Sequence, residues 1–161
     1  MEIGVGGGRV AKKVREVMSS GKLTLVDISK EMLKVAESNI GGPTEDLEIE
    51  FVHNPLSPDL PQQVKDTQFD YIYCFDVLVH CDLHTVYKTL ANLHPLLKDG
   101  SKLFISLADV TSDLGFQRFK NQKQFKVSGF CFMSPDMALK IVDEAGYKVV
   151  KSNLKGHETS I

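Results

Sequence analysis

The first chemistry that the sequence suggests is the binding of a nucleotide-like cofactor by a glycine-rich loop at the amino end. The chain begins MEIGVGGGRV, so Gly4, Gly6 and Gly8 follow almost directly behind its first residue. Glycine tolerates positive φ and lets the backbone approach a ligand closely, while the helix expected after the loop presents free amide groups. Such a loop suits any nucleotide-like cofactor.

A carboxylate follows at the end of the next expected strand. The segment LTLVD is short and rich in apolar and β-branched residues, and it ends in Asp27. A carboxylate in this place can accept hydrogen bonds from both hydroxyls of a ribose. The unit of strand, glycine loop, helix, strand and acid indicates adenosine binding. The alternative is an ordinary β-α-β turn in which Asp27 caps the next helix.

The elements that must position these residues alternate between strand and helix periodicity. Strands are predicted at residues 1–3, 23–27, 47–52, 69–75, 102–108 and 147–153. Helices are predicted after Gly8, where Val10, Val14, Val17 and Met18 recur, after Ser29, at about 83–97 and at 135–145. Ser29 and Ser134 are the expected N-caps, and Gly100 and Gly146 the expected helix ends. This alternation predicts parallel strands with right-handed crossovers.

In an open parallel sheet, ligands bind beyond the carboxyl ends of the strands. Each predicted strand ends in a polar or flexible residue: the glycines of the loop, Asp27, His53 with Asn54, Asp76, and Asp109. The predicted topology places all five strand ends on one edge of the sheet, which makes that edge the candidate site.

The glycine loop also separates two families of cofactor-binding proteins. The dinucleotide fingerprint G-x-G-x-x-G/A would need a small residue where Arg9 stands, which disfavours a nicotinamide-dependent oxidoreductase. The sequence instead reads E-x-G-x-G-x-G from Glu2 to Gly8, which resembles motif I of the class I S-adenosylmethionine-dependent methyltransferases. The resemblance extends over residues 23–40, 69–82, 93–106 and 134–150.

This resemblance implies a Rossmann-like, doubly wound α/β fold: a mostly parallel sheet with helices on both faces, in one domain spanning 1–161. The first strand is expected to be short and the seventh to be missing, since the chain looks truncated at both ends of the family pattern.

The resemblance also implies S-adenosyl-L-methionine as the cofactor and assigns residues to it. Gly4, Gly6 and Gly8 would pass beneath its methionine and ribose, Asp27 would hold the ribose, and Glu2 would orient the methionine amino group. Asn54 and Pro55 stand where the family commonly binds adenine; Pro55 has no N–H to donate, so Leu56 is a substitute. The remaining expected contacts are Ile28, Met32, Phe75, Asp76 and Val77.

Methyl transfer is an in-line displacement at an activated sulfonium, so the protein mainly aligns the reactants and excludes water. A base is needed only where the acceptor atom must lose a proton. His80 is the candidate for that role; the alternative is a structural histidine that caps a helix or packs. His80, Cys81 and His84 match no established zinc spacing, so no metal is expected.

The segment from Leu114 to Phe132 bears on the substrate. It interleaves cations with phenylalanines: Arg118, Lys120, Lys123 and Lys126 with Phe116, Phe119, Phe125, Phe130 and Phe132. This pattern suits an acidic or aromatic small molecule held by a lid or pocket wall. Single-stranded nucleic acid is a weaker alternative, and simple packing of the phenylalanines on the sheet is another.

The composition limits the remaining classes. The chain has 161 residues and a net charge of −2, so no global field favours nucleic acid. Three cysteines without a C-x-x-C spacing argue against a disulfide framework, and no segment resembles a membrane helix or a signal peptide. We expect a cytoplasmic enzyme that methylates a small molecule. A non-catalytic domain that binds a protein partner or forms an oligomer is the second hypothesis.

Overall fold

The computed structural model describes residues 1–123 and 129–153. These residues form two compact units, which are described separately below. The first unit consists of residues 1–75 and 96–105, and the second of residues 76–95 and the described part of 106–161. That residues 1–161 act as one domain stays a prediction.

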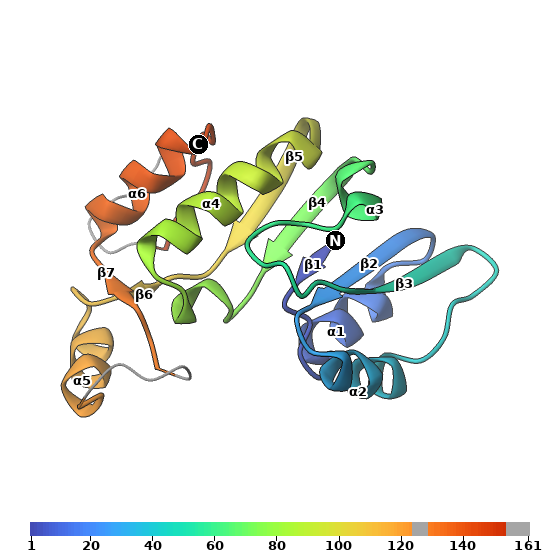
Figure 1. Ribbon diagram of the computed structural model, residues 1–161, viewed down its shortest axis with the longest axis horizontal. Helices are drawn as coiled ribbons and strands as arrows, with labels where there is room; N and C mark the ends of the chain where they lie inside the picture. The colour runs from blue at the N-terminus through green and yellow to red at the C-terminus, as the bar shows by residue number, and fades with distance from the viewer. Residues whose placement is uncertain (124–128, 154–161) are drawn as a thin grey trace. The chain divides into compact units, whose positions relative to one another are not determined.

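The first unit is built on a five-stranded sheet with the order β3-β2-β1-β4-β5 (Figure 1). Its strands are β1 (Glu2–Ile3), β2 (Gly21–Asp27), β3 (Leu47–His53), β4 (Phe69–Cys74) and β5 (Leu97–Ile105). All four neighbouring pairs run parallel. The predicted α/β fold with a parallel sheet is therefore confirmed, as is the short first strand of two residues. The carboxyl ends of β1 to β4 meet at one edge of this unit.

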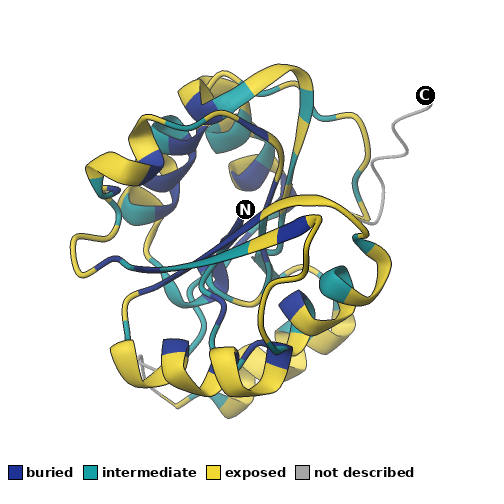
Figure 2. Cartoon of the chain, turned by 90° about the vertical axis from the view of Figure 1, so that its right-hand side faces the viewer, coloured by how far each residue is buried: buried dark blue, intermediate teal, exposed yellow. Residues whose placement is uncertain are grey.

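The helices of the first unit are α1 (Arg9–Val17), α2 (Lys30–Ile40) and the short α3 (Gln62–Lys65). The helix α2 starts as predicted, because the Ser29 hydroxyl accepts a hydrogen bond from the Met32 N–H at 3.2 Å. The helices α1 and α2 share one hydrophobic core with the sheet, formed by Val5, Ala11, Leu23, Leu25, Leu33, Ala36 and Ile40 (Figure 2). Val17 was expected on the apolar face of α1, but it is 85% exposed because the helix ends there and turns it to solvent.

The strand β2 holds the candidate ribose acid. Residues 23–27 are all buried, so side chains on both faces of β2 are covered. A strand covered on both faces reads as a nearly continuous apolar run, as LTLV does here apart from Thr24. Asp27 is the last residue of this rigid strand and is 8% exposed, so its carboxylate is held in a fixed position.

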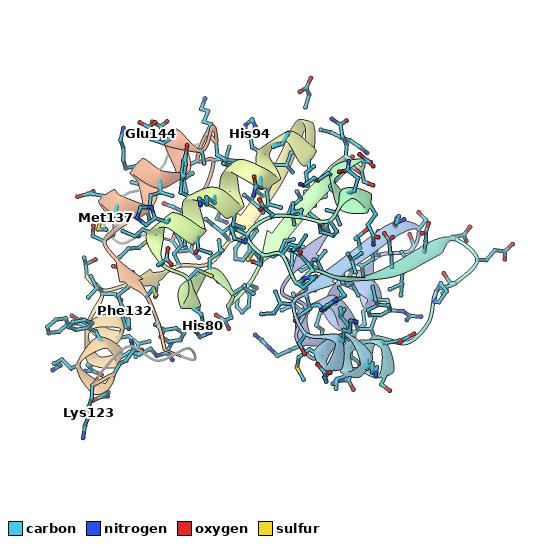
Figure 3. All side chains as sticks on the ribbon, viewed as in Figure 1. His80, His94, Lys123, Phe132, Met137 and Glu144 are labelled. Atoms are coloured by element: carbon cyan, nitrogen blue, oxygen red, sulfur yellow. The ribbon has the colours of Figure 1, made fainter. Side chains whose placement is uncertain are left out.

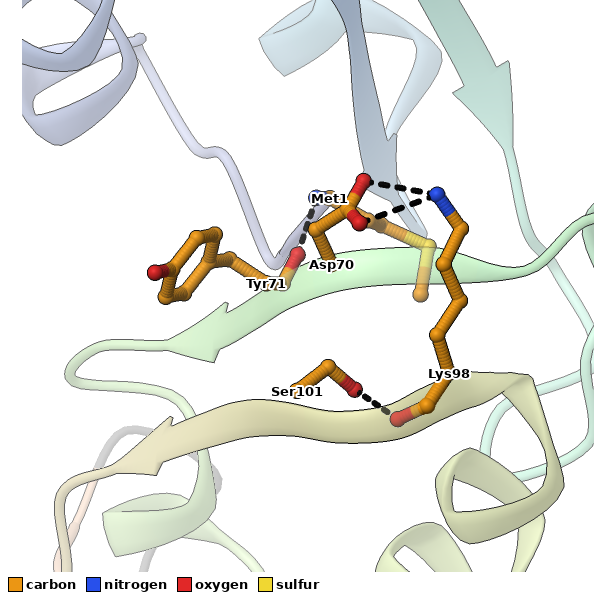
Figure 4. Close-up of polar contacts among 5 residues, drawn as sticks. All are labelled: Met1, Asp70, Tyr71, Lys98 and Ser101. Atoms are coloured by element: carbon orange, nitrogen blue, oxygen red, sulfur yellow. Dashed lines mark hydrogen bonds and ion pairs between the residues drawn. The ribbon is translucent and has the colours of Figure 1, made fainter.

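The strand β5 differs from the prediction at Gly100. Gly100 has φ 77°, yet it lies inside β5 rather than at the end of a helix, since Pro95 already follows the last residues of α4. The pairing with β4 shifts there: Phe69 pairs with Leu97, but Tyr71 pairs with Lys102. The extra residues form a bulge in which Ser101 bonds to the Lys98 carbonyl and Lys98 forms an ion pair with Asp70 at 2.8 Å (Figure 4).

The second unit carries the remaining helices: α4 (Leu83–Leu93), α5 (Asp113–Asn121) and α6 (Pro135–Glu144). The predicted helices at 83–97 and 135–145 are confirmed apart from the last residues of the former, which form a 3-10 turn (His94–Leu96). Ser134 caps α6, Pro135 is its first residue, and Gly146 follows it with φ 92°. Tyr147 then donates from its hydroxyl to the Leu90 carbonyl at 2.9 Å, which ties the end of α6 to α4.

Two predictions in this unit are wrong. Asp109 does not end the fifth strand, because β5 stops at Ile105 and Asp109 belongs to β6 (Ala108–Asp109), which pairs in parallel with β7 (Phe132–Met133). Residues 147–153 form no strand: Tyr147, Val149 and Val150 have strand propensity, but the segment pairs with no strand among the described residues. Strand propensity alone does not make a strand without backbone pairing.

Among residues 1–123 and 129–153, no helix has the length and apolar character needed to cross a membrane.

Candidate cofactor site

The glycine loop and Asp27 form one hydrogen-bonded arrangement. The Asp27 carboxylate accepts the Gly6 N–H at 2.8 Å through Oδ2 and the Ser29 N–H at 2.9 Å through Oδ1. The Gly4 and Val5 amides both donate to the Val26 carbonyl, at 2.7 and 3.1 Å. The loop after β1 is thus fastened to the end of β2. A carboxylate offers about four acceptor positions, so about two remain at Asp27 for a ligand.

The glycines of this loop serve different purposes. Gly4, Gly6 and Gly8 all have positive φ, at 74°, 51° and 83°. A Cβ on Gly8 would meet the Ile40 side chain at 2.9 Å and the Ala36 backbone at 3.2 Å, whereas a Cβ on Gly6 would meet nothing within 4 Å. Gly8 is therefore needed for packing between α1 and α2, and Gly6 borders open space.

Glu2 lies buried at the start of the loop. It is 2% exposed, and its carboxyl oxygen accepts a hydrogen bond from the Tyr73 hydroxyl at 3.0 Å. These two residues are register partners on β1 and β4. Burial raises the pKa of Glu2 from 4.5 to about 7, against the smaller lowering effect of the Tyr73 hydrogen bond. A cation that approached Glu2 would favour the ionised carboxylate and so lower this raised pKa.

This shift predicts a pH-dependent stability that Glu2→Gln removes. Between pH 4.5 and 7 the unfolded chain ionises Glu2 while the folded chain keeps the proton, so the free energy of unfolding falls as pH rises. Urea denaturation at pH 5 and pH 8 should show Glu2→Gln gaining up to about 3 kcal/mol on the wild type over that interval. The difference between the two proteins reports Glu2 together with its interaction with the Met1 amine, whose pKa Glu2 raises; Glu37→Gln, on the exposed surface of α2, is the matched control. An equal difference at both pH values would contradict the shift.

The loop after β3 is shaped by Asn54. This side chain is buried, donates to the Asp59 carbonyl at 2.9 Å and accepts the Leu56 N–H at 3.2 Å. The Asn54 N–H donates to the Asp27 carbonyl at 2.8 Å, which joins this loop to the end of β2. Since the Leu56 N–H is already bonded, Leu56 offers a ligand its side chain rather than its amide. Pro55 is exposed beside it.

Three of the expected cofactor contacts are apolar side chains that the structure leaves exposed. Ile28 directly follows Asp27, Met32 lies in the first turn of α2, and Leu56 lies in the loop after β3; they are 67%, 39% and 61% exposed. Single exposed apolar residues are common on proteins. Here they lie after β2, in the first turn of α2 and in the loop after β3; that they contact adenine stays a prediction.

Sequence reasoning missed two contributors to this edge. The Arg9 guanidinium lies over the Phe75 ring at 5.3 Å, and Phe75 in turn stacks with Phe104 at 6.1 Å. In the sequence, Arg9 is recognisable only as a mismatch to the dinucleotide fingerprint. Asn39 donates from its side chain to the Gly7 carbonyl at 2.9 Å and so holds the middle of the loop. Nothing in the local sequence of α2 marks Asn39 for this role.

The other candidate residues belong to the second unit. Asp76 has φ 58° and donates its N–H to the Ser106 hydroxyl at 2.8 Å. The Val77 carbonyl accepts the His80 N–H at 3.0 Å and opens the 3-10 turn η1 (Leu78–His80). Their place beside the cofactor residues of the first unit stays a prediction.

The ring of His80 is held by two contacts within the second unit. Its Nδ1 lies 2.9 Å from the Gly129 carbonyl, and its ring stacks on Phe130 at 5.1 Å. A carbonyl only accepts, so Nδ1 must carry the proton, and in the neutral ring Nε2 keeps the lone pair. His80 is thus both fixed in place and in the tautomer that a base acting through Nε2 requires.

Within the described residues, no three side chains of His, Cys, Asp or Glu gather closely enough to hold a metal. Cys81 and Cys131 are both free thiols, and burial raises the pKa of each.

Comparison with known proteins identifies the family to which the chain belongs. The sequence model of the family described as "Methyltransferase domain" matches residues 1–105, more than half of the chain. No curated protein matches the chain significantly.

Solved structures share the fold. A SAM-dependent methyltransferase from Thermotoga maritima, described as a possible histamine N-methyltransferase, has 23% identity and a TM-score of 0.67 over 92% of this chain and 62% of its own. Magnesium protoporphyrin IX methyltransferase from Synechocystis PCC 6803, solved with bound SAH, has 18% identity and a TM-score of 0.68 over 93% and 64%. A SAM-dependent methyltransferase from Leishmania major has 16% identity and a TM-score of 0.65 over 99% and 59%.

The chain thus spans about three fifths of the length of these structures. The parallel sheet, the glycine loop behind β1 and the acid ending β2 stand in the matched region. The sequence match over residues 1–105 and the shared fold lead to the same conclusion: the chain belongs to the methyltransferase domain family.

Proposed function

We propose that this protein binds S-adenosylmethionine at the edge formed by the glycine loop and Asp27 and transfers its methyl group to a small molecule. The observation that carries the proposal is the 2.8 Å bond between the Gly6 N–H and the Asp27 carboxylate, which joins loop and acid into one site. Family membership supports the cofactor, as does the Synechocystis structure with bound SAH.

The residues take the following roles in this proposal. Gly4, Gly6 and Gly8 pass beneath the methionine and ribose, and the open acceptor positions of Asp27 take the ribose hydroxyls. The exposed side chains of Ile28, Met32 and Leu56 contact the adenine, for which Asn54 shapes the loop. Glu2 lies buried where the methionine ammonium would ionise it. Phe75, Asp76 and Val77 complete the cofactor contacts.

The chain must align the methyl group with the acceptor atom and, where the acceptor loses a proton, must supply a base. The sulfonium of the cofactor supplies the activated methyl group. His80 is the base, because its Nδ1 is bonded to a carbonyl and its Nε2 keeps a lone pair.

The test is acceptor-dependent formation of S-adenosylhomocysteine from S-adenosylmethionine across panels of small phenols, thiols, amines and carboxylates. Turnover with one panel, lowered by about 10²-fold or more in His80→Gln for a proton-bearing acceptor, is expected. A folded chain that neither binds the cofactor nor turns over any panel would instead fit the second hypothesis from the sequence, a non-catalytic domain that binds a partner.

A further inference from the structure

The second unit contains a continuous ladder of five rings, which we call the ring ladder. It runs from Phe116 to Phe119 at 6.0 Å, then to Phe132 at 5.6 Å, Phe130 at 5.9 Å and His80 at 5.1 Å between ring centroids. The rings come from α5, from β7 with the residues before it, and from η1; Figure 3 labels two of them, His80 and Phe132. Sequence reasoning had gathered these phenylalanines without His80; Phe125 and Lys126 lie outside the described residues.

Hydrogen bonds to the backbone of residues 130–132 hold the ring ladder in place. The Gln122 side chain, at the end of α5, accepts the Phe130 N–H at 2.7 Å and donates to the Phe130 carbonyl at 2.9 Å. The Cys131 N–H donates to the Val79 carbonyl at 2.7 Å, and Phe132 pairs with Ala108 in the second sheet. The rings are therefore positioned by bonds to α5, η1 and β6, so a ligand would not have to order them.

The ladder is nonetheless open to solvent. The helix α5 buries none of its residues, and Phe116 and Phe119 are 49% and 48% exposed. A helix that formed only to cover a core would bury an apolar stripe. The phenylalanines of α5 thus leave ring surface to a partner, which counts against the interpretation that they simply pack on the sheet.

Two cationic side chains, Arg118 and Lys120, lie beside the rings. The Arg118 guanidinium lies 4.7 Å over the Phe130 ring, and the Lys120 ammonium lies 5.6 Å from the Phe116 ring. In the described part of the chain no carboxylate pairs with Arg118, although Asp113 lies at the start of the same helix. A guanidinium placed on a ring face keeps its edge N–H groups for a carboxylate, which it binds with two parallel hydrogen bonds.

We propose that the ring ladder binds a small aromatic carboxylate, whose ring stacks on the exposed phenylalanines and whose carboxylate pairs with Arg118. This inference rests on the proposed function in one respect: it makes that ligand the methyl acceptor, with His80 in the same ladder as the base. Binding itself needs only the second unit's residues.

The test is titration calorimetry of the full chain with three probes. 4-Hydroxybenzoate has both features, 4-hydroxybenzamide lacks the charge, and cyclohexanecarboxylate lacks the ring. Saturable binding of 4-hydroxybenzoate, at least about fivefold tighter than that of either other probe, is expected. Equal binding of the amide or of the cyclohexane acid, or no saturable binding of 4-hydroxybenzoate, would overturn the proposal. So would displacement of 4-hydroxybenzoate by a short oligothymidylate that binds more tightly.

Variants locate the site. Arg118→Gln and Phe119→Leu should each weaken the binding of 4-hydroxybenzoate at least about fivefold. Arg118→Lys should recover only part of this affinity, because a lysine cannot bind the carboxylate through two parallel hydrogen bonds. Lys88→Gln, an exposed cation on α4, is the matched control and should change nothing. Unchanged binding in Arg118→Gln would contradict the assignment.

Titration of the same samples with S-adenosylhomocysteine separates the two claims. If the homocysteine ligand binds and 4-hydroxybenzoate does not, this inference fails and the cofactor proposal stands. If 4-hydroxybenzoate alone binds, the binding site at the ring ladder stands, whereas the cofactor proposal and the role of the ligand as methyl acceptor fail.

Discussion

In an Asp27→Ala variant, S-adenosylhomocysteine is expected to bind about 100-fold more weakly or not at all. The carboxylate has two functions at once: it would take the ribose hydroxyls, and it accepts the amides of Gly6 and Ser29. Loss of two hydrogen bonds to a charged group also costs stability, on the order of 3 kcal/mol. Calorimetry at 10 °C, below the lowered melting temperature, measures the binding loss in a folded sample.

Two controls keep this result interpretable. Asp27→Asn preserves the volume of the side chain and should destabilise the protein less than Asp27→Ala. It places an amide N–H against a backbone N–H, so it should still weaken the binding of S-adenosylhomocysteine. Asp99→Ala removes an exposed carboxylate in the bulge of β5 and should leave binding unchanged. A folded Asp27→Ala that bound as tightly as the wild type would remove Asp27 from the site.

Gly8→Ala is expected to cost much more stability than Gly6→Ala, whereas Gly6→Ala is expected to act mainly on cofactor binding. At Gly8 an alanine combines the left-handed backbone with contacts at 2.9 Å to Ile40, so the free energy of unfolding should fall by about 3 kcal/mol or more. At Gly6 the methyl group enters open space, so only the backbone cost of about 1 kcal/mol is expected. Since that open space is where the cofactor would pass, the Gly6→Ala protein should stay folded but bind S-adenosylhomocysteine more weakly.

Urea denaturation and calorimetry on both variants check this pair. A Gly6→Ala protein with undiminished binding would show that the cofactor does not approach the loop at this point. A Gly8→Ala protein as stable as the wild type would show that Ile40 repacks without cost.

The first unit could be predicted from the sequence because its signals are local. The hydroxyl of Ser29 caps α2, glycines with positive φ end β1, and the apolar run before Asp27 forms a strand buried on both faces. Each of these features follows from residues within a few positions of one another. The same loop and acid were also the part of the candidate site that the sequence identified.

The sequence-based predictions were wrong where contacts between residues distant in the chain determine the structure. Gly100 looks like a helix end, but the register shift between β4 and β5 uses its positive φ inside a strand. Asp109 follows an apolar segment like the other strand ends, yet it pairs with Met133 in a separate sheet. His80 could be named as a candidate base, but its tautomer depends on the Gly129 carbonyl, 49 residues away in the chain. No local pattern contains these contacts.

The central claim is that the edge built from the glycine loop and Asp27 binds the adenosyl cofactor. Isothermal titration of the full chain with S-adenosylhomocysteine, with NADH as the competing ligand and Asp27→Ala as the control, tests it most directly. The account predicts saturable binding of S-adenosylhomocysteine that is lost in the variant, and no binding of NADH. A folded wild-type chain that fails to bind S-adenosylhomocysteine would contradict the account.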